Sequence, residues 1–333
     1  MTAGIYLDTY LSALAPWLTR DDVTDLLINR PGEVWIETTS GMLTRIAAPQ
    51  VTEVVLSRLA RQIAAASHQG VNREQPLLSA TLPDGGRVQI IAPPATREGT
   101  ILAIRKHVVS DMSLDDLAAT GLFGDAPSQR RVARDDELAA LLKGGDKAGF
   151  LKEAARAKKT IVISGGTSTG KTTLLNALVR EIDTNERLIV IEDAPEIRLS
   201  HPNAVGLIAV RGEQGEARVD ADDLLRASLR MRPDRILLGE LRGKEAFAFL
   251  RAVNSGHPGS ITTVHADSPE GAIDQIALLA MTAGLDLDWA KIQTYVRRVI
   301  DVIVQLDRPN GKRRVGDIRF LPMESAAPQA AND

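Results

Sequence analysis

Apolar residues in the first third of the chain come in short runs that are separated by turn residues. Between residues 26 and 46 the runs are interrupted by Pro31-Gly32 and by Ser40-Gly41, which predicts strands joined by turns. Within 52–66 the apolar residues instead recur every three or four positions, which predicts a helix with one buried face. We therefore expect a sheet and a helix in this part of the chain.

Further strand-like runs follow the predicted helix. Residues 77–82 and 87–91 flank the sequence Pro-Asp-Gly-Gly, as the two arms of a hairpin do. Residues 100–109 form another run that is rich in strand-forming side chains. Together these elements predict a mixed α+β domain over residues 1–121.

The pattern weakens toward the end of this domain and beyond it. Ser113, with Asp116 three residues later, predicts the start of a short helix, and Gly121 is placed to end it. The composition of 122–149 then shifts to Asp, Arg, Gly and Pro, and only Glu137 to Leu142 has helical spacing. We expect 122–149 to form a linker between two domains.

Beyond residue 150 strand-like and helical patterns alternate. This order is typical of a mainly parallel sheet with crossover helices, and its strands are predicted near 160–164, 187–192, 235–239 and 260–264. We expect a second, α/β domain over 150–322. The Ala/Pro/Gln-rich residues 323–333 are expected to be a disordered tail.

Composition adds limits to this picture. The chain of 333 residues is long enough for two cores, and with 44% hydrophobic and 25% charged residues it has the composition of a globular protein. It contains no cysteine, which excludes disulfides and thiolate metal sites and agrees with a reducing cytosol. Apolar runs stay well short of the roughly 20 residues of a membrane span, so we expect a cytosolic protein. A net charge of −3 and 3% aromatics argue against direct nucleic-acid binding as a primary activity.

The first motif with clear chemistry is a phosphate-binding loop. The sequence GGTSTGKT matches G-x-x-x-x-G-K-[ST], follows a β-branched run and precedes a helical pattern. Amides at the start of the helix can bind phosphate oxygens, the lysine reaches the β/γ bridge, and Thr172 offers its hydroxyl to Mg²⁺. The predicted nucleotide-binding residues are Gly165, Gly166, Thr167, Ser168, Thr169, Gly170, Lys171, Thr172 and Thr173.

Acidic residues follow two of the predicted strands. Glu240 comes at the end of an apolar strand, where a carboxylate can orient or deprotonate the attacking water. Gly239 stands where many phosphate-loop enzymes carry a metal-binding aspartate. We therefore expect Asp193, after a second strand that ends at Glu192, to hold Mg²⁺ directly or through water. We expect Glu192 to be a further catalytic residue and Glu196 to complete the acidic cluster.

The histidines are less informative by themselves. His257 and His265 bracket the run GHPGSITTVH. A single histidine more often makes a structural hydrogen bond than a catalytic one, and no matching ligand set predicts zinc. The residues alone leave the role of His265 open.

Several segments, taken in order, resemble a known family. GGTSTGKTT, IEDAPEI, LRMRPDRILLGELRG and SGHPGSITTVHA are similar to the motor box, aspartate box, Walker B segment and histidine box of secretion ATPases. INRPGEVWIE, PDGGRVQI and AIRKH resemble the VirB-type traffic ATPases of type IV secretion and conjugation. The resemblance implies a homo-hexameric ring in which each subunit has an N-terminal domain and a RecA-like P-loop domain with ATP between them. It also implies a position at the inner membrane, reached through other components of a secretion or conjugation apparatus.

The same resemblance implies roles for particular residues. It places Arg87 and Arg105 near the terminal phosphates and makes His265 a sensor of the γ-phosphate, with His257 in support. Without it, both arginines would be surface residues on strands. Because the stretch 125–149 is long, an N-terminal domain could cover either its own nucleotide or that of a neighbour.

The resulting expectation is a Mg²⁺-dependent ATPase that powers type IV secretion, conjugative transfer or pilus biogenesis. A type IV pilus or type II secretion motor is an alternative, although the absence of cysteine excludes the tetracysteine zinc module common in the type II branch. Two further candidates are a DNA-stimulated RecA-like translocase and a nucleotide-binding regulator that does not hydrolyse ATP. Glu240 beside a complete phosphate loop argues against the regulator.

Overall fold

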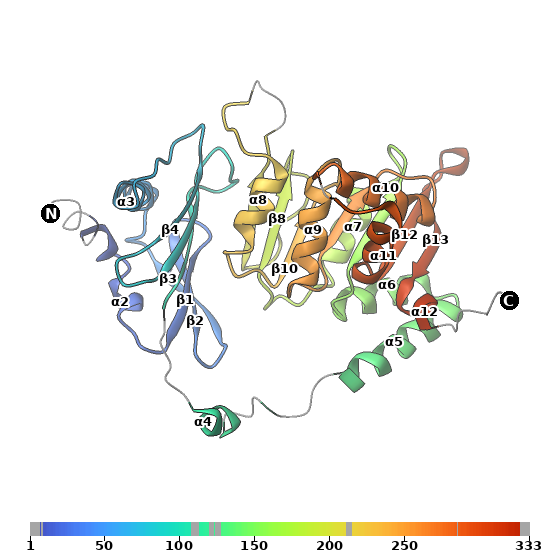
Figure 1. Ribbon diagram of the computed structural model, residues 1–333, viewed down its shortest axis with the longest axis horizontal. Helices are drawn as coiled ribbons and strands as arrows, with labels where there is room; N and C mark the ends of the chain where they lie inside the picture. The colour runs from blue at the N-terminus through green and yellow to red at the C-terminus, as the bar shows by residue number, and fades with distance from the viewer. Residues whose placement is uncertain are drawn as a thin grey trace.

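The chain forms two sheets, each with its own helices (Figure 1). The computed structural model describes residues 7, 9–107, 113–119, 123, 128–210, 215–284 and 286–326. One sheet has six strands and lies in the N-terminal part, and the other has seven strands and lies in the C-terminal part. This mixed α/β organisation agrees with the expectation from the sequence.

The N-terminal sheet is antiparallel throughout, in the order β3-β2-β1-β6-β5-β4. Its strands are β1 (Val23–Ile28), β2 (Gly32–Thr38), β3 (Leu43–Ala48), β4 (Leu77–Thr81), β5 (Arg87–Ile91) and β6 (Ile101–Arg105). The predicted strands and the predicted hairpin are confirmed. Helix α3 (Glu53–Ala66) begins at Thr52, whose hydroxyl accepts a hydrogen bond from the amide of Val55. The apolar side of α3 is buried, and the short α2 (Ala15–Leu18) precedes β1.

The C-terminal sheet has the order β13-β12-β7-β11-β10-β8-β9. Its strands are β7 (Ile161–Gly165), β8 (Leu188–Glu192), β9 (Ala204–Ile208), β10 (Arg235–Leu238), β11 (Ile261–Val264), β12 (Val302–Asp307) and β13 (Arg314–Phe320). Six strands are parallel and only β13 is antiparallel to its neighbour. The four predicted parallel strands are confirmed, whereas β9, β12 and β13 have no counterpart among the predicted elements.

Helices cover this second sheet. They are α6 (Lys147–Arg156), α7 (Lys171–Val179), α8 (Ala221–Ser228), α9 (Glu245–Asn254), α10 (Pro269–Met281), α11 (Trp289–Val299) and α12 (Leu321–Ala326), and a single 3₁₀ turn, η1 (Pro309–Gly311), joins β12 to β13. Within the described residues no helix is both long and apolar enough to cross a membrane. Parallel strands buried between helices leave their carboxyl ends free to build a site.

The segment between the domains is more ordered than its composition predicts. α5 spans Ser128–Lys143, although only 137–142 was expected to be helical. Leu138 is 1% exposed and packs in one cluster with Phe150 and Phe320, so this helix belongs to the core of the C-terminal part. Few apolar residues are needed to hold a helix that packs on one side only, which explains why composition was misleading.

The structure confirms the short helix predicted after Ser113 but differs from the disorder predicted at the start of the C-terminal tail. The predicted short helix is α4 (Leu114–Ala119), and Ser113 accepts from the amide of Asp116 as expected of a cap, while Gly121 lies outside the described residues. At the C-terminus, 323–326 lie in α12, which differs from the expected disorder. The rest of the tail, 327–333, is outside the described residues.

The two parts of the chain pack against each other near β8 and β9. One hydrophobic cluster contains Leu27 and Trp35 of the N-terminal sheet together with Val205 and Leu207 of β9. The guanidinium of Arg187 is completely buried beside this cluster and donates to Asn29 and Asn203. Burial lowers the pKa of Arg187 to about 9.

A second buried arginine holds the C-terminal core together. Arg235 is 0% exposed, and its guanidinium makes two hydrogen bonds to Glu186, at 2.9 and 2.7 Å, and one to the carbonyl of Ala155 at 2.6 Å. Burial raises the pKa of Glu186, but hydrogen bonds and attraction from Arg235 and Lys158 outweigh that effect, so its pKa lies below the usual value.

Arg235→Ala is therefore expected to lower the free energy of unfolding by about 3 kcal/mol, because the largely buried carboxylate of Glu186 keeps only Lys158, whose side chain is more exposed, as a partner. Because the pKa of Glu186 is lowered, the stabilisation by the pair is present above the pKa of an unfolded glutamate and is lost as the pH falls. Urea denaturation at pH 7 and pH 4 would measure both effects. Arg156→Ala, at an exposed ion pair on α6, is the control and should cost under about 1 kcal/mol. Equal losses in the two variants would contradict the prediction.

Candidate nucleotide-binding site

The phosphate-binding loop lies between β7 and α7, as predicted. β7 ends at Gly165 and α7 begins at Lys171, so the loop amides are at the N-terminus of a nine-residue helix. A Cβ on Gly165 would lie 2.6 Å from Thr169 Oγ1 and 2.8 Å from the carbonyl of Leu306, which leaves room only for glycine. Gly170 has φ +101°, in the left-handed region that favours glycine. Both glycines of the motif are therefore required by the shape of the loop.

Lys171 points along the inside of this loop. Its ammonium donates to the carbonyls of Gly165 and Gly166, at 2.9 and 3.1 Å, and lies 3.5 Å from His265 Nδ1. Burial lowers the pKa of Lys171, and the nearby carboxylate of Glu240 acts in the opposite direction. A cation in a half-buried position beside helix amides attracts polyphosphate anions strongly.

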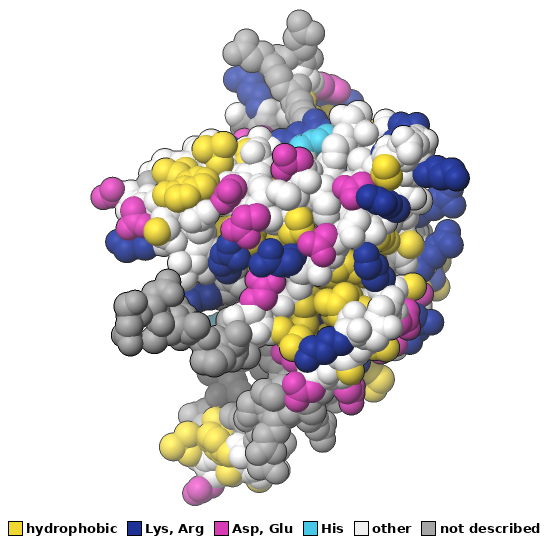
Figure 2. All heavy atoms as spheres, turned by 90° about the vertical axis from the view of Figure 1, so that its right-hand side faces the viewer, with side chains coloured by type: hydrophobic (Ala, Val, Ile, Leu, Met, Phe, Trp, Pro, Cys, Tyr) yellow, Lys and Arg dark blue, Asp and Glu magenta, His cyan; other side chains and the backbone are white. Residues whose placement is uncertain are grey.

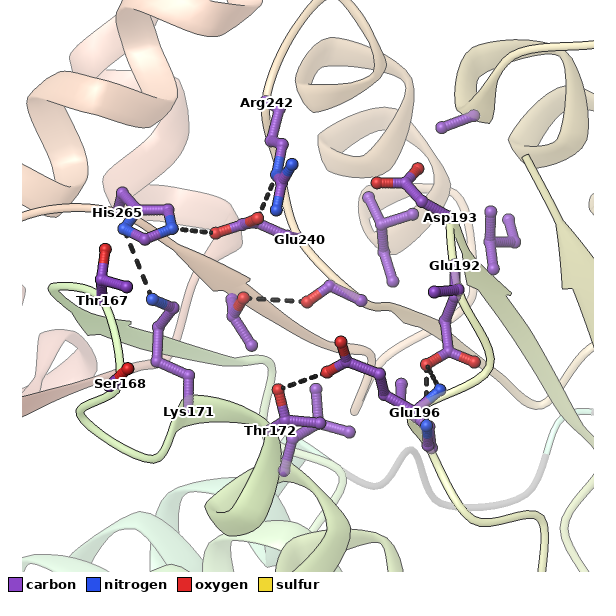
Figure 3. A pocket seen from close by; sticks show the side chains of 18 residues that line it. Thr167, Ser168, Lys171, Thr172, Glu192, Asp193, Glu196, Glu240, Arg242 and His265 are labelled. Atoms are coloured by element: carbon purple, nitrogen blue, oxygen red, sulfur yellow. Dashed lines mark hydrogen bonds and ion pairs between the residues drawn. The ribbon is translucent and has the colours of Figure 1, made fainter. Parts of the chain in front are cut away.

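Glu240 and His265 meet across two neighbouring strands. Glu240 follows β10 and His265 follows β11, and His265 Nε2 lies 2.7 Å from Glu240 Oε1 (Figure 3). The other carboxylate oxygen of Glu240 is paired with the guanidinium of Arg242. The carboxylate is thus held from two sides and has a defined orientation at the edge of the loop.

A second acidic group lies at the end of β8. The hydroxyl of Thr172 donates to Glu196 at 3.0 Å (Figure 3). Glu192 Oε1 accepts the amides of Glu196 and Ile197, at 3.0 and 2.7 Å. Asp193 lies between these two glutamates in sequence and lines the same pocket. The predicted acidic cluster is therefore assembled, with Glu196 as the carboxylate in contact with Thr172.

Gly239 has a packing role next to this cluster. A Cβ at this position would lie 3.2 Å from Glu192 Cγ and 3.6 Å from the carbonyl of Ile191. An aspartate at 239 would therefore crowd Glu192. This contact gives a physical reason for the glycine where other phosphate-loop enzymes have an acid.

These groups share one pocket at the carboxyl ends of the parallel strands. The predicted residues among its lining are Thr167, Ser168, Lys171, Thr172, Glu192, Asp193, Glu196, Glu240 and His265. Ligands of α/β folds bind at this edge of the sheet. Among the described residues no group of three or more acidic or histidine side chains is arranged as a metal cage.

Eight predicted residues are not in this lining. Five of them belong to the phosphate loop and the first turn of α7: Gly165, Gly166, Thr169, Gly170 and Thr173. The other three come from elsewhere in the chain. Arg87 on β5 and Arg105 on β6 are register partners on the N-terminal sheet, where both are exposed and Arg105 donates to Asp25 at 2.9 Å. His257 lies before β11 and is half-buried, and burial lowers its pKa. The structure of the single chain does not bring these three side chains to the pocket.

Sequence reasoning missed two residues of the site. Arg242 contacts Glu240, and its place two residues after the acidic strand end was a usable signal. Arg97, from the N-terminal part, forms an ion pair with Glu192. No local pattern predicts the role of Arg97, because its partner Glu192 lies 95 residues further along the chain.

Comparisons with known proteins agree with the geometry. The model of the family "Type II/IV secretion system protein" matches residues 12–332. The chain is 40% identical over 339 residues to the type IV secretion system protein VirB11 of Bartonella quintana, covering 97% of this chain and 95% of that protein. It is 41% identical over 327 residues to the type IV secretion system protein PtlH of Bordetella pertussis, covering 94% and 95%.

A solved structure is similar over the whole chain. The crystal structure of the VirB11 ATPase from the Brucella suis type IV secretion system, in complex with sulphate, superposes with a TM-score of 0.85. The two chains are 36% identical, and the match covers 95% of this chain and 97% of that one. With 95% of this chain covered, the match includes both sheets.

Proposed function

This chain belongs to the type II/IV secretion system protein family and is a type IV secretion ATPase, and on that premise we propose that it hydrolyses ATP with Mg²⁺ as one subunit of a homo-hexameric ring. The observation that carries the proposal is the shared pocket in which the phosphate loop, Glu240 and His265 come together. ATP turnover by the purified chain, with and without Mg²⁺, tests it. Turnover that survives EDTA would contradict the metal requirement.

The phosphate loop and the polar side chains opposite it have separate roles in this proposal. The amides of 166–171 bind the phosphates, and the ammonium of Lys171 exchanges its carbonyl partners for β- and γ-phosphate oxygens. Glu240 orients the attacking water, while Arg242 and His265 keep its carboxylate in place. His265, whose Nδ1 lies 3.5 Å from the ammonium of Lys171, would contact the terminal phosphate in this proposal.

The residues near Thr172 fit a magnesium ion. Mg²⁺ takes few protein ligands and keeps waters and phosphate oxygens, so the lack of a three-residue cage among the described residues does not conflict with it. The hydroxyl of Thr172 and the carboxylate of Glu196, 3.0 Å apart, are hard oxygen donors at the loop. Asp193, which lines the same pocket, would act through water in this proposal. When bound, the ion would offset negative charge on the phosphates.

The ring supplies a reason for the two distant arginines. Guanidinium groups that contact the γ-phosphate can do so only while ATP is bound. Hydrolysis removes this contact and so weakens the attraction between the domains, which lets one domain move relative to the other. Because Arg87 and Arg105 are absent from the pocket of their own chain, we propose that they act on the nucleotide of a neighbouring subunit. The site would then be complete only in the assembled ring.

Mixing of variants tests this arrangement. Arg105→Ala should lower turnover about a hundredfold while ADP affinity stays within about twofold, because only the γ-phosphate contact is lost. When Arg105→Ala is mixed with Lys171→Ala, turnover should partly recover, since some neighbouring pairs then combine an intact loop with an intact arginine. Arg61→Ala, exposed on α3 of the same domain, is the matched control and should behave as wild type. Mixtures with no recovery would favour arginines that act within their own chain.

The proposed setting is the cytoplasmic side of the inner membrane, where the ring would bind other components of a secretion or conjugation apparatus. The type IV relatives support this setting. Direct nucleic-acid binding is not part of the proposal: the face in Figure 2 intersperses Lys and Arg with Asp and Glu rather than forming one basic stripe. ATP turnover that rises severalfold with DNA would instead favour the translocase alternative.

A further inference from the structure

A short segment of the N-terminal part extends the C-terminal sheet. Thr96, in the loop between β5 and β6, forms an antiparallel bridge with Leu207 of β9. The amide of Arg97 donates to the carbonyl of Gly206 at 3.0 Å, and the amide of Ile208 donates to the carbonyl of Ala95 at 2.9 Å. Main-chain hydrogen bonds therefore fix this loop to the free edge of β9.

The side chain of Arg97 crosses β9 at a glycine. A Cβ on Gly206 would lie 2.4 Å from Arg97 Cδ, so any larger residue would block its path. Beyond this crossing the guanidinium donates to the carbonyl of Ile197 at 2.9 Å and forms an ion pair with Glu192. The side chains of Arg97 and Glu192 are 15% and 3% exposed, so the pair is largely removed from water.

Glu192 connects this arginine to the phosphate loop. One of its oxygens accepts the amides of Glu196 and Ile197, and the other pairs with Arg97. Arg97 therefore holds loop 192–197 at two points, the carboxylate of Glu192 and the carbonyl of Ile197. Glu196 at the end of this loop accepts the hydroxyl of Thr172. A continuous series of contacts thus leads from Arg97 to the first turn of α7.

We propose that Arg97 is a positioning residue that anchors Glu192, so that loop 192–197 keeps Glu196 at Thr172 and the metal-binding oxygens stay in place. The proposal rests on the proposed Mg²⁺-dependent hydrolysis. In it Glu192 is an anchor rather than a base, because both of its oxygens are engaged. The N-terminal part acts on the same pocket through Arg97, so that a shift of this part would reach the oxygens at Thr172.

Removal of the anchor should affect turnover more than nucleotide binding. Arg97→Ala is expected to lower kcat about tenfold to a hundredfold, as a misplaced catalytic group does, with KM for ATP within about twofold because the phosphate loop is untouched. Arg97→Lys should give an intermediate kcat. Gly206→Ala should reproduce the effect of Arg97→Ala, since its methyl group displaces the arginine side chain.

The matched control breaks another contact between the same two parts of the chain. Glu37 accepts two hydrogen bonds from Arg232, at 2.5 and 2.6 Å, and neither residue lines the pocket. Glu37→Gln should therefore leave kcat within about twofold of wild type. A kcat in Arg97→Ala no lower than in Glu37→Gln would overturn the proposal, and so would equal effects of Arg97→Ala on kcat and KM.

Two further measurements separate positioning from a general loss of stability. The effects of Arg97→Ala and Glu192→Gln on kcat should be strongly non-additive, because both remove the same contact. Hydrogen exchange of the nucleotide-free protein should show faster exchange at the amides of Glu196 and Ile197 in Arg97→Ala, with α7 unchanged. Additive effects, or unchanged exchange in this loop, would overturn the anchor. A wild-type chain that turns over no ATP would instead overturn the proposed function, while the exchange measurement would still decide on Arg97.

Discussion

Lys171→Ala is expected to abolish ATP turnover, with a loss of at least about a thousandfold in kcat. The ammonium is half-buried between the loop carbonyls and His265, so it contributes a cation in a place where water screens little. Alanine leaves the loop amides in place but removes the charge that offsets the β- and γ-phosphates. Steady-state phosphate release over a range of ATP concentrations would measure the loss.

Two variants make this test specific. Lys171→Arg keeps the positive charge. The planar guanidinium of arginine is larger than the ammonium, however, and does not fit the position in which the ammonium contacts two carbonyls, so turnover should remain low. Lys152→Ala removes an exposed lysine of α6 and should leave turnover unchanged. Near-normal turnover in Lys171→Ala would mean that the pocket described above is not the site of hydrolysis.

Glu240→Gln should bind ATP as tightly as wild type and lower kcat by about a hundredfold or more, the range for a missing general base. The amide has the shape of the carboxylate, so the contacts with His265 and Arg242 can persist while the ability to accept a proton is lost. Binding of a fluorescent ATP analogue and single-turnover hydrolysis would separate the two effects. A trapped ATP complex is the expected product.

The control for Glu240 is another glutamate in an ion pair. Glu270 on α10 pairs with Arg297 at the surface, and Glu270→Gln should leave both binding and turnover unchanged. If Glu240→Gln hydrolysed ATP at the normal rate, a different carboxylate would have to position the water. Glu196, which contacts Thr172, would then be the first to examine.

Local patterns were sufficient for much of this molecule. The phosphate loop was recognisable because its glycines, lysine and threonine depend on neighbours within eight residues and on the strand and helix at its ends. The acidic ends of β8 and β10 were recognisable because an apolar run followed by a carboxylate is a local signal. The N-terminal strands and α3 followed from periodicity in the same way.

Two of the errors concern partners that are distant in sequence. α5 looked like a linker because its composition is polar, yet Leu138 packs with Phe320 in the core. β12 pairs with β7, which lies far before it in the chain. No window of neighbouring residues contains these contacts. The pairs β8–β9 and β12–β13, in contrast, are formed by strands that are close in sequence.

Residue types at short spacing were enough to predict the chemistry of the site, because a phosphate loop and a carboxylate at a strand end are both local patterns. The tertiary structure alone decided which groups hold that chemistry in place. It paired Glu240 with His265, brought Glu196 to Thr172, and carried Arg97 over Gly206 to Glu192. Such contacts form between elements that only the packing of whole strands brings together, and their geometry is therefore not written in any local pattern.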